Sequence, residues 1–166
     1  MTAKDIYDNC RSWLQFAETK NGFALAFCSA VIAAEVSLLS GVGDMLKPFV
    51  MTSIFLVTMA AICSLVSFIP QLGMTHSSGA GQEPPPGGIV YFGHIARRDN
   101  AAYIAQATKL LGIKDSDAMS VELLSQCHSL SVIIVRKLRL FYASVLIAGF
   151  GIISPLLGAA GRWLCV

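Results

Sequence analysis

The chain has 166 residues, of which 55% are hydrophobic and only 13% are charged, against roughly 25% charged in an average soluble domain. The formal net charge of +2 is nearly neutral and predicts no nucleic acid polymer as a partner. Three apolar runs, over residues 22–40, 49–69 and 140–161, are each about long enough to cross a bilayer core of ~30 Å. We therefore expect an all-α integral membrane protein, and too few residues remain for a large catalytic domain.

The N-terminal segment, residues 1–21, is expected to be cytoplasmic and to contain an amphipathic helix over residues 4–20. One face of this helix contains Ile6, Cys10, Trp13 and Ala17, and the charged residues lie elsewhere. Such a helix either lies at the membrane interface, with its Trp near the headgroups, or packs against a partner.

The first two apolar runs predict a transmembrane hairpin within residues 22–70, with spans over about 22–40 and 49–69. Two glycines and a proline between the spans favour a short turn. The third span, over residues 140–161, is expected to leave a short outer tail at residues 162–166.

Small residues four apart form a ridge on the first span, made of Gly22, Ala26, Ala30 and Ala34. Such a ridge lets two helix backbones approach closely in a membrane. The partner is either the second span or another copy of the chain, and the sequence leaves both open.

Glu35 also lies in the first span, where a carboxylate is costly unless it is neutral, paired or in water. One interpretation is that it lines or gates a pore. The other is that it lies near the outer interface, five residues before Ser40, and reaches the headgroups.

Residues 71–139 are expected to hold a linker and a small cytoplasmic helical module. The linker, over residues 73–88, is rich in Gly, Ser and Pro and cannot form a core. The apolar stretch over residues 89–96 is expected to be irregular or a short helix. Seven basic residues against five acidic ones favour a cytoplasmic position for the whole segment, by the positive-inside rule.

Two further helices are predicted before the third span. Asp99 or Asn100 can cap a helix over residues 101–111, which the following Gly terminates. A last helix of roughly forty residues is expected to begin at Asp115 or Ser116 and to continue into the third span, because one apolar stripe runs through it.

Four residues around the apolar stretch are candidates for contacting a nucleotide: Tyr91, His94, Arg97 and Arg98. Arginine offers a fork of donors suited to phosphate, and aromatic rings can stack on a base. The alternative is a solvated basic turn near anionic lipid. Likewise, the basic residues before the third span are expected to anchor it at the headgroups, with nucleotide contact as the alternative; they are Arg136, Lys137 and Arg139.

The sequence has no phosphate loop and no hydrolase or kinase motif, and its Cys and His residues lack metal-ligand spacing. We therefore expect no enzyme activity, no cofactor and no metal site.

The chain resembles the transmembrane effectors of the bacterial Pycsar (pyrimidine cyclase) anti-phage systems over nearly its whole length. The resemblance rests on the polar residues 18–21 at the start of the first span and on SFIP at residues 67–70. It rests further on YFGHIA at residues 91–96, on Tyr103, and on the helix SLSVIIVRKLRLFYAS at residues 129–144 that enters the last span.

This resemblance implies a partner pyrimidylate cyclase that makes cyclic CMP or cyclic UMP upon infection. It implies that the effector binds this nucleotide, assembles in the bacterial inner membrane and impairs membrane integrity, so that the infected cell stops before the phage matures. Inverting a 99:1 equilibrium requires ~5.5 kcal/mol, so we expect a homo-oligomer with several equivalent sites.

Two rival interpretations stay open. The first is a related membrane effector that is gated by another messenger. The second is a non-sensing membrane scaffold subunit, which would bind no messenger and would require a membrane partner.

Overall fold

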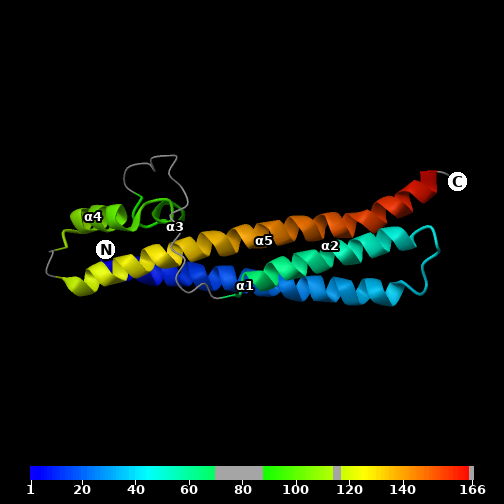
Figure 1. Cartoon of the computed structure of the whole chain (residues 1–166), viewed down its shortest axis with the longest axis horizontal. Coiled ribbons are helices and arrows are strands. Elements are labelled where there is room, and N and C mark those ends of the chain that lie inside the picture. The colour runs from blue at the N-terminus through cyan, green and yellow to red at the C-terminus, as the bar shows by residue number, and fades with distance from the viewer. Residues whose placement is uncertain (70–87, 114–116, 165–166) are drawn as a thin grey trace. The chain divides into compact units, whose positions relative to one another are not determined.

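The computed structural model describes residues 1–69, 88–113 and 117–164, with side chains up to residue 161. The chain forms five α-helices in these ranges, and the described residues contain no strand (Figure 1). The predicted linker over 73–88, apart from Gly88, and the predicted helix start at Asp115 or Ser116 lie outside the described residues.

The chain divides into two compact units. Unit 1 contains Met1–Glu18 and Pro70–Leu138, and unit 2 contains Thr19–Ile69 and Arg139–Val166. Helix α1, Ala3–Leu38, and helix α5, Ala118–Leu164, each contribute to both units.

Helix α1 joins the predicted amphipathic helix and the first predicted span without a break, over 36 residues. In unit 1 its buried face is the predicted one, because Ile6, Cys10 and Ala17 are fully buried. Trp13 stays 37% exposed on the edge of that face. A helical repeat of apolar residues therefore placed this face correctly.

Unit 1 also contains two short helices, α3 at Phe92–Ile95 and α4 at Asn100–Leu111. The Asp99 side chain caps α4 by accepting a hydrogen bond from the backbone N–H of Ala101 at 3.1 Å. Gly112 ends α4 with φ 64°, a left-handed conformation that glycine adopts without strain. Both signals were read correctly from the sequence, and the apolar stretch does form a short helix.

Unit 2 contains helix α2, Lys47–Val66, together with the membrane parts of α1 and α5. Helix α2 buries every third or fourth residue: Val50, Ser53, Val57, Ala60 and Ser64. It contacts α5 closely where α5 has glycine, since a Cβ at Gly151 would come within 2.9 Å of the Val57 side chain. The hydroxyl of Ser144 also donates to the backbone carbonyl of Ala60 at 2.8 Å.

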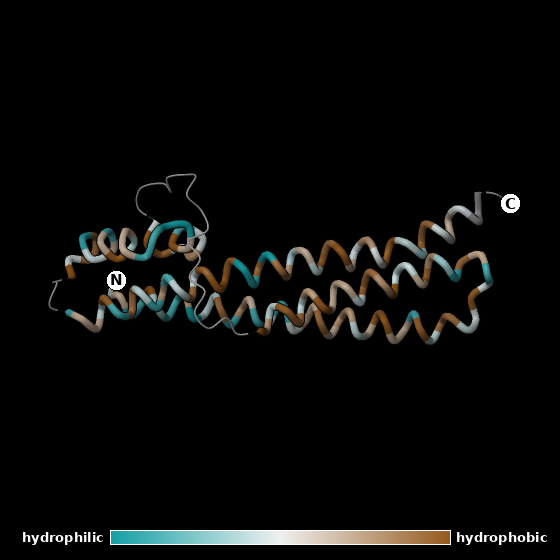
Figure 2. Tube along the Cα trace, in the orientation of Figure 1, coloured by the Kyte–Doolittle hydropathy of each residue, from teal (hydrophilic) through white to brown (hydrophobic). Residues whose placement is uncertain are grey.

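In the described parts of the chain, three helices are long and apolar enough to cross a membrane: α1, α2 and α5. Figure 2 shows their hydrophobic character along the trace of unit 2. The predicted fold class, an all-α membrane protein with a helical hairpin and a long last helix, is confirmed. Helix α5 has 47 residues, somewhat longer than expected.

Candidate functional site

The short helix α3 holds the YFGHIA segment in place through two buried side chains. Phe92 is 6% exposed and Ile95 is fully buried, whereas Tyr91 is 52% exposed. The backbone before α3 is tied down as well, because the buried Tyr103 hydroxyl donates to the Ile89 carbonyl at 3.4 Å. Burial raises the pKa of Tyr103 above its ordinary value, so this hydroxyl remains a neutral donor.

Aromatic side chains gather around α3 to form a cluster that we call the aromatic cluster: Trp13, Phe16, Tyr91, Phe92 and His94. The Phe92 ring centroid lies 5.1 Å from that of Trp13 and 4.6 Å from that of Tyr91. Tyr91 and His94 meet edge to face at 5.1 Å, and Trp13 and Phe16 do so at 5.5 Å. Because several of these rings are partly exposed, the cluster offers aromatic faces to a ligand.

His94 is the polar member of the aromatic cluster. Its Nδ1 atom is buried and has no hydrogen-bond partner among the described residues. A Cβ at Gly88 would lie 2.3 Å from this atom, so the ring requires glycine there. A buried ring nitrogen without a partner is a group that a ligand could satisfy.

The two predicted arginines, Arg97 and Arg98, differ in their exposure and contacts. Arg97 is exposed, and it makes no ion pair within the described ranges. Arg98 instead donates through Nη1 to the side chain of Gln106 on α4. Its backbone carbonyl also contacts His128 Nε2 at 2.8 Å. The structure therefore brings Tyr91 and His94 together, while Arg98 fastens the turn after α3 to its neighbours.

The sequence does not predict that Trp13 belongs to the aromatic cluster. Its expected place is at the headgroups or against a partner, whereas the structure packs it on Phe92. The signal was the i, i+3 spacing of Trp13 and Phe16, which puts two aromatic rings on adjacent positions of a helix surface.

Glu18 and Asn21, the two ends of the polar stretch 18–21, belong to different units. Glu18 forms an ion pair with Lys137 at 2.9 Å, and both residues belong to unit 1. Asn21 is fully buried in unit 2. Lys137, expected to anchor α5 at the headgroups, thus has a protein partner. Its side chain is only 13% exposed.

In unit 2 the ridge on α1 points away from the helices it could pack on. Ala26, Ala30 and Ala34 are exposed, and a Cβ at Gly22 would meet nothing within 4 Å. The fully or nearly fully buried residues of α1 in this unit are Asn21 and Cys28 instead. The ridge therefore does not pack against the second span within this chain.

Glu35 turns toward α2 rather than away from the bundle. The Ser53 hydroxyl donates to Glu35 Oε1 at 2.5 Å, and Ser53 itself is fully buried. The second carboxylate oxygen, Oε2, is buried and lacks a hydrogen-bond partner in the described parts of the chain. The hydrogen bond from Ser53 therefore offsets part of the free-energy cost of placing this carboxylate in a membrane span.

A second polar contact lies deeper in the same bundle. The hydroxyls of Ser64 on α2 and Ser144 on α5 are 2.9 Å apart, and both residues are fully buried. Interhelical hydrogen bonds of this kind help to hold membrane helices together. Over the described residues, no group of three or more His, Cys, Asp or Glu side chains could hold a metal ion.

Comparison with protein families gives one finding for this chain. A family model described as the Pycsar effector protein domain matches residues 2–163. The match covers nearly the whole chain, so the chain belongs to this family and is a membrane effector of anti-phage defence, linked to a cyclase. Comparisons with curated proteins and with solved structures give no match.

Proposed function

Starting from membership of the Pycsar effector family, we propose that this chain is activated by cyclic CMP or cyclic UMP from a partner pyrimidylate cyclase. Activation would impair the integrity of the bacterial inner membrane and abort phage infection. The observation that carries this proposal is the partly exposed aromatic cluster of unit 1 in a chain that also has three helices able to cross a membrane.

The aromatic cluster suits the base of a cyclic nucleotide. Stacking of a base on an aromatic side chain contributes about 1–3 kcal/mol, and Tyr91 has an exposed ring for it. His94 Nδ1, which has no hydrogen-bond partner among the described residues, could bond an edge of the ligand once the ring rotates. The exposed guanidinium of Arg97 fits the single negative charge of the cyclic phosphate, and Arg98 positions the turn through Gln106.

The response would take place in unit 2. We propose that the exposed ridge of Gly22, Ala26, Ala30 and Ala34 packs against another copy, so that the effector works as a homo-oligomer. Its exposure within the single chain supports this role. Glu35, inside the bundle, is proposed to line or gate a pore that opens through the membrane. Helices α1 and α5 belong to both units, so each provides a continuous connection between binding and response.

The arrangement in the cell is part of the same proposal. Residues 1–21 and 71–139 would be cytoplasmic, and residues 162–166 would form a short outer tail. The basic excess of residues 71–139 supports this orientation. In a chain whose native cysteines are replaced by serine, a cysteine introduced at exposed Ala102 should be labelled by an impermeant reagent only after the inner membrane is opened.

The first test is the thermal stability of the detergent-solubilised full chain with cyclic UMP, cyclic CMP, cyclic AMP and cyclic GMP in turn. A ligand at 100 times its Kd stabilises the folded state by about 2.7 kcal/mol, so Tm must rise with the activating nucleotide. A rise with a pyrimidine nucleotide alone supports the sensor. A folded, monodisperse protein that responds to none of the four would favour another messenger or the non-sensing scaffold subunit.

Matched variants assign the site. Tyr91→Ala should abolish the Tm shift, whereas Tyr142→Ala, at an exposed tyrosine of unit 2, should leave it intact. Arg97→Gln should weaken binding, and Lys109→Gln, at an exposed lysine of α4, serves as its control. If both variants of a pair lose the Tm shift equally, the tested residue, Tyr91 or Arg97, is not part of the nucleotide site.

The ridge has its own test. Ala30→Leu places a large side chain where copies would meet, and it should reduce both the oligomer and the nucleotide-dependent toxicity. Thr58→Leu makes a comparable change at an exposed position of α2. If Ala30→Leu leaves both properties unchanged, the ridge is not the interface.

A further inference from the structure

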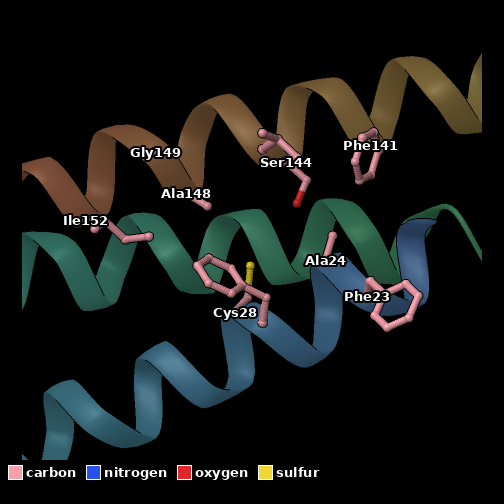
Figure 3. Close-up of a pocket in the computed structure, with 10 residues that line it drawn as sticks. Phe23, Ala24, Cys28, Phe141, Ser144, Ala148, Gly149 and Ile152 are labelled. Atoms are coloured by element: carbon pink, nitrogen blue, oxygen red, sulfur yellow. The ribbon is translucent and has the colours of Figure 1, made fainter. Parts of the chain in front are cut away.

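A groove lies between α1 and α5 on the surface of unit 2 (Figure 3). Its cavity volume is about 370 Å³, and its walls include Phe23 and Phe27 from α1 and Phe141 and Val145 from α5. Phe23 is 72% exposed and Val145 is 46% exposed, so the groove opens outward. Ser144 also lines it, but its hydroxyl is already engaged with Ser64 and Ala60. The occupant of this groove must therefore be apolar.

The length of the groove matches one leaflet of a bilayer. Along α5 it extends from Phe141 to Ile152, which is about 16 Å at 1.5 Å per residue. Half of a ~30 Å hydrocarbon core is about 15 Å. A membrane helix from a second copy would need the full span, whereas one acyl chain fits.

A cation lies at one end of the groove. Lys20 Nζ is 5.4 Å from the centroid of the Phe141 ring, which forms that end. Lys20 comes three residues before Phe23, so both lie on neighbouring positions of the same helix face. A lysine near the end of a span extends its ammonium group toward the headgroup region. The groove thus has a cation at one end and an apolar channel about one leaflet long beyond it. This arrangement is complementary to the phosphate and one acyl chain of a phospholipid.

We propose that unit 2 binds one phospholipid from the leaflet that meets Lys20. The phosphate group contacts the Lys20 ammonium, and one acyl chain fills the groove between α1 and α5. This site lies wholly within unit 2 and does not depend on the nucleotide, so its success or failure is separate from that of the proposed function.

The test titrates dioleoyl phosphatidylglycerol into the detergent-solubilised full chain and counts bound lipid by native mass spectrometry. Gly149→Leu is the main variant, because Gly149 lines the groove and a Cβ there meets nothing within 4 Å. A leucine should therefore fill the groove without displacing protein atoms, and we expect lipid binding at least tenfold weaker. Lys20→Gln should weaken it about fivefold, the effect of one basic residue at an anionic membrane surface.

The matched control is Gly161→Leu, the same substitution at another open position of α5 that does not line the groove. It should bind lipid as the wild type does. If Gly149→Leu does not fold, Val145→Phe narrows the groove from its exposed edge and should produce the same loss.

Two results would overturn the site. Equal lipid binding by the wild type and by a folded Gly149→Leu protein would show that the groove is not where the lipid binds. A changed oligomer mass in that variant, with lipid binding unchanged, would assign the groove to a second copy of the chain. If Lys20→Gln binds as tightly as the wild type, the phosphate contact is wrong.

Discussion

Unit 1 and unit 2 are both helical and both bury small side chains, but unit 1 buries large apolar ones as well. The fully buried core of unit 1 includes large apolar residues: Ile6, Ile95, Tyr103 and Leu124. The core of unit 2 is built from smaller ones: Cys28, Val57, Ala60 and Ala148. Unit 2 also buries three serines completely: Ser53, Ser64 and Ser144.

The large side chains of unit 2 are on its outside. Phe55 and Phe150 are 63% and 68% exposed. In water, exposing such large apolar side chains would be unfavourable. Lipid tails are as apolar as leucine, so membrane helices gain nothing by hiding such residues and associate through close packing and hydrogen bonds instead. Unit 1 is therefore stabilised mainly by burial of apolar side chains, and unit 2 by close packing of its helices. Four substitutions test this difference between the units.

The largest effect is expected from Ile95→Ala in unit 1. Truncation of a fully buried isoleucine should destabilise this unit by about 2–5 kcal/mol. Hydrogen exchange should show faster exchange of the α4 amides and unchanged protection in α2. Leu110→Ala, at a residue that is 56% exposed, is the control and should have little effect. Equal loss of protection in both units would mean that they do not unfold separately.

Gly151→Leu tests close fit in unit 2. A Cβ at this position already lies 2.9 Å from Val57 and 3.3 Å from the Ser53 carbonyl, so overpacking should destabilise the bundle by about 1–3 kcal/mol. Thermal unfolding in detergent measures the loss. The same substitution at Gly149, where a Cβ meets no neighbour, should be tolerated. Similar Tm values for the two variants would contradict the packing of α2 against α5.

The cap of α4 at Asp99 should make an intermediate contribution to stability. Asp99→Ala removes the hydrogen bond to Ala101 N–H and should destabilise α4 by about 1 kcal/mol. Hydrogen exchange in the first turn of α4 reports the change. Asp8→Ala, at an exposed residue inside α1, removes a charge without removing a cap. A null result at Asp99 would indicate that α4 is held by its buried face alone.

The smallest effect is expected from Ser64→Ala. Interhelical hydrogen bonds in membrane proteins contribute about 0.6 kcal/mol on average. Ser144 also keeps its bond to the Ala60 carbonyl in this variant. Thermal unfolding should therefore shift slightly, and Ser29→Ala should not shift it, because Ser29 is exposed and bonds only its own helix. A loss of several kcal/mol would make polar contacts, rather than close fit, the main support of unit 2.

Local signals in the sequence predicted the elements well. The cap at Asp99, the glycine that ends α4 and the apolar repeat through Ile6 and Ala17 all depend on neighbours within a few residues. The contacts of the aromatic cluster were predicted only in part. Tyr91 and His94 could be proposed together because they belong to one motif. Trp13 could not, since it lies far away in the chain and meets Phe92 only after folding.

By itself, the sequence determined that the chain is an all-α membrane protein of three long apolar helices, because length and hydropathy suffice for that conclusion. The motif YFGHIA and its neighbours also pointed to the right family. Only the tertiary structure decided which face of each helix is covered. It turned Glu35 toward Ser53, left the small-residue ridge exposed and paired Lys137 with Glu18. In lipid the hydrophobicity of a residue does not say whether it faces inward, so these contacts depend on how the helices fit together.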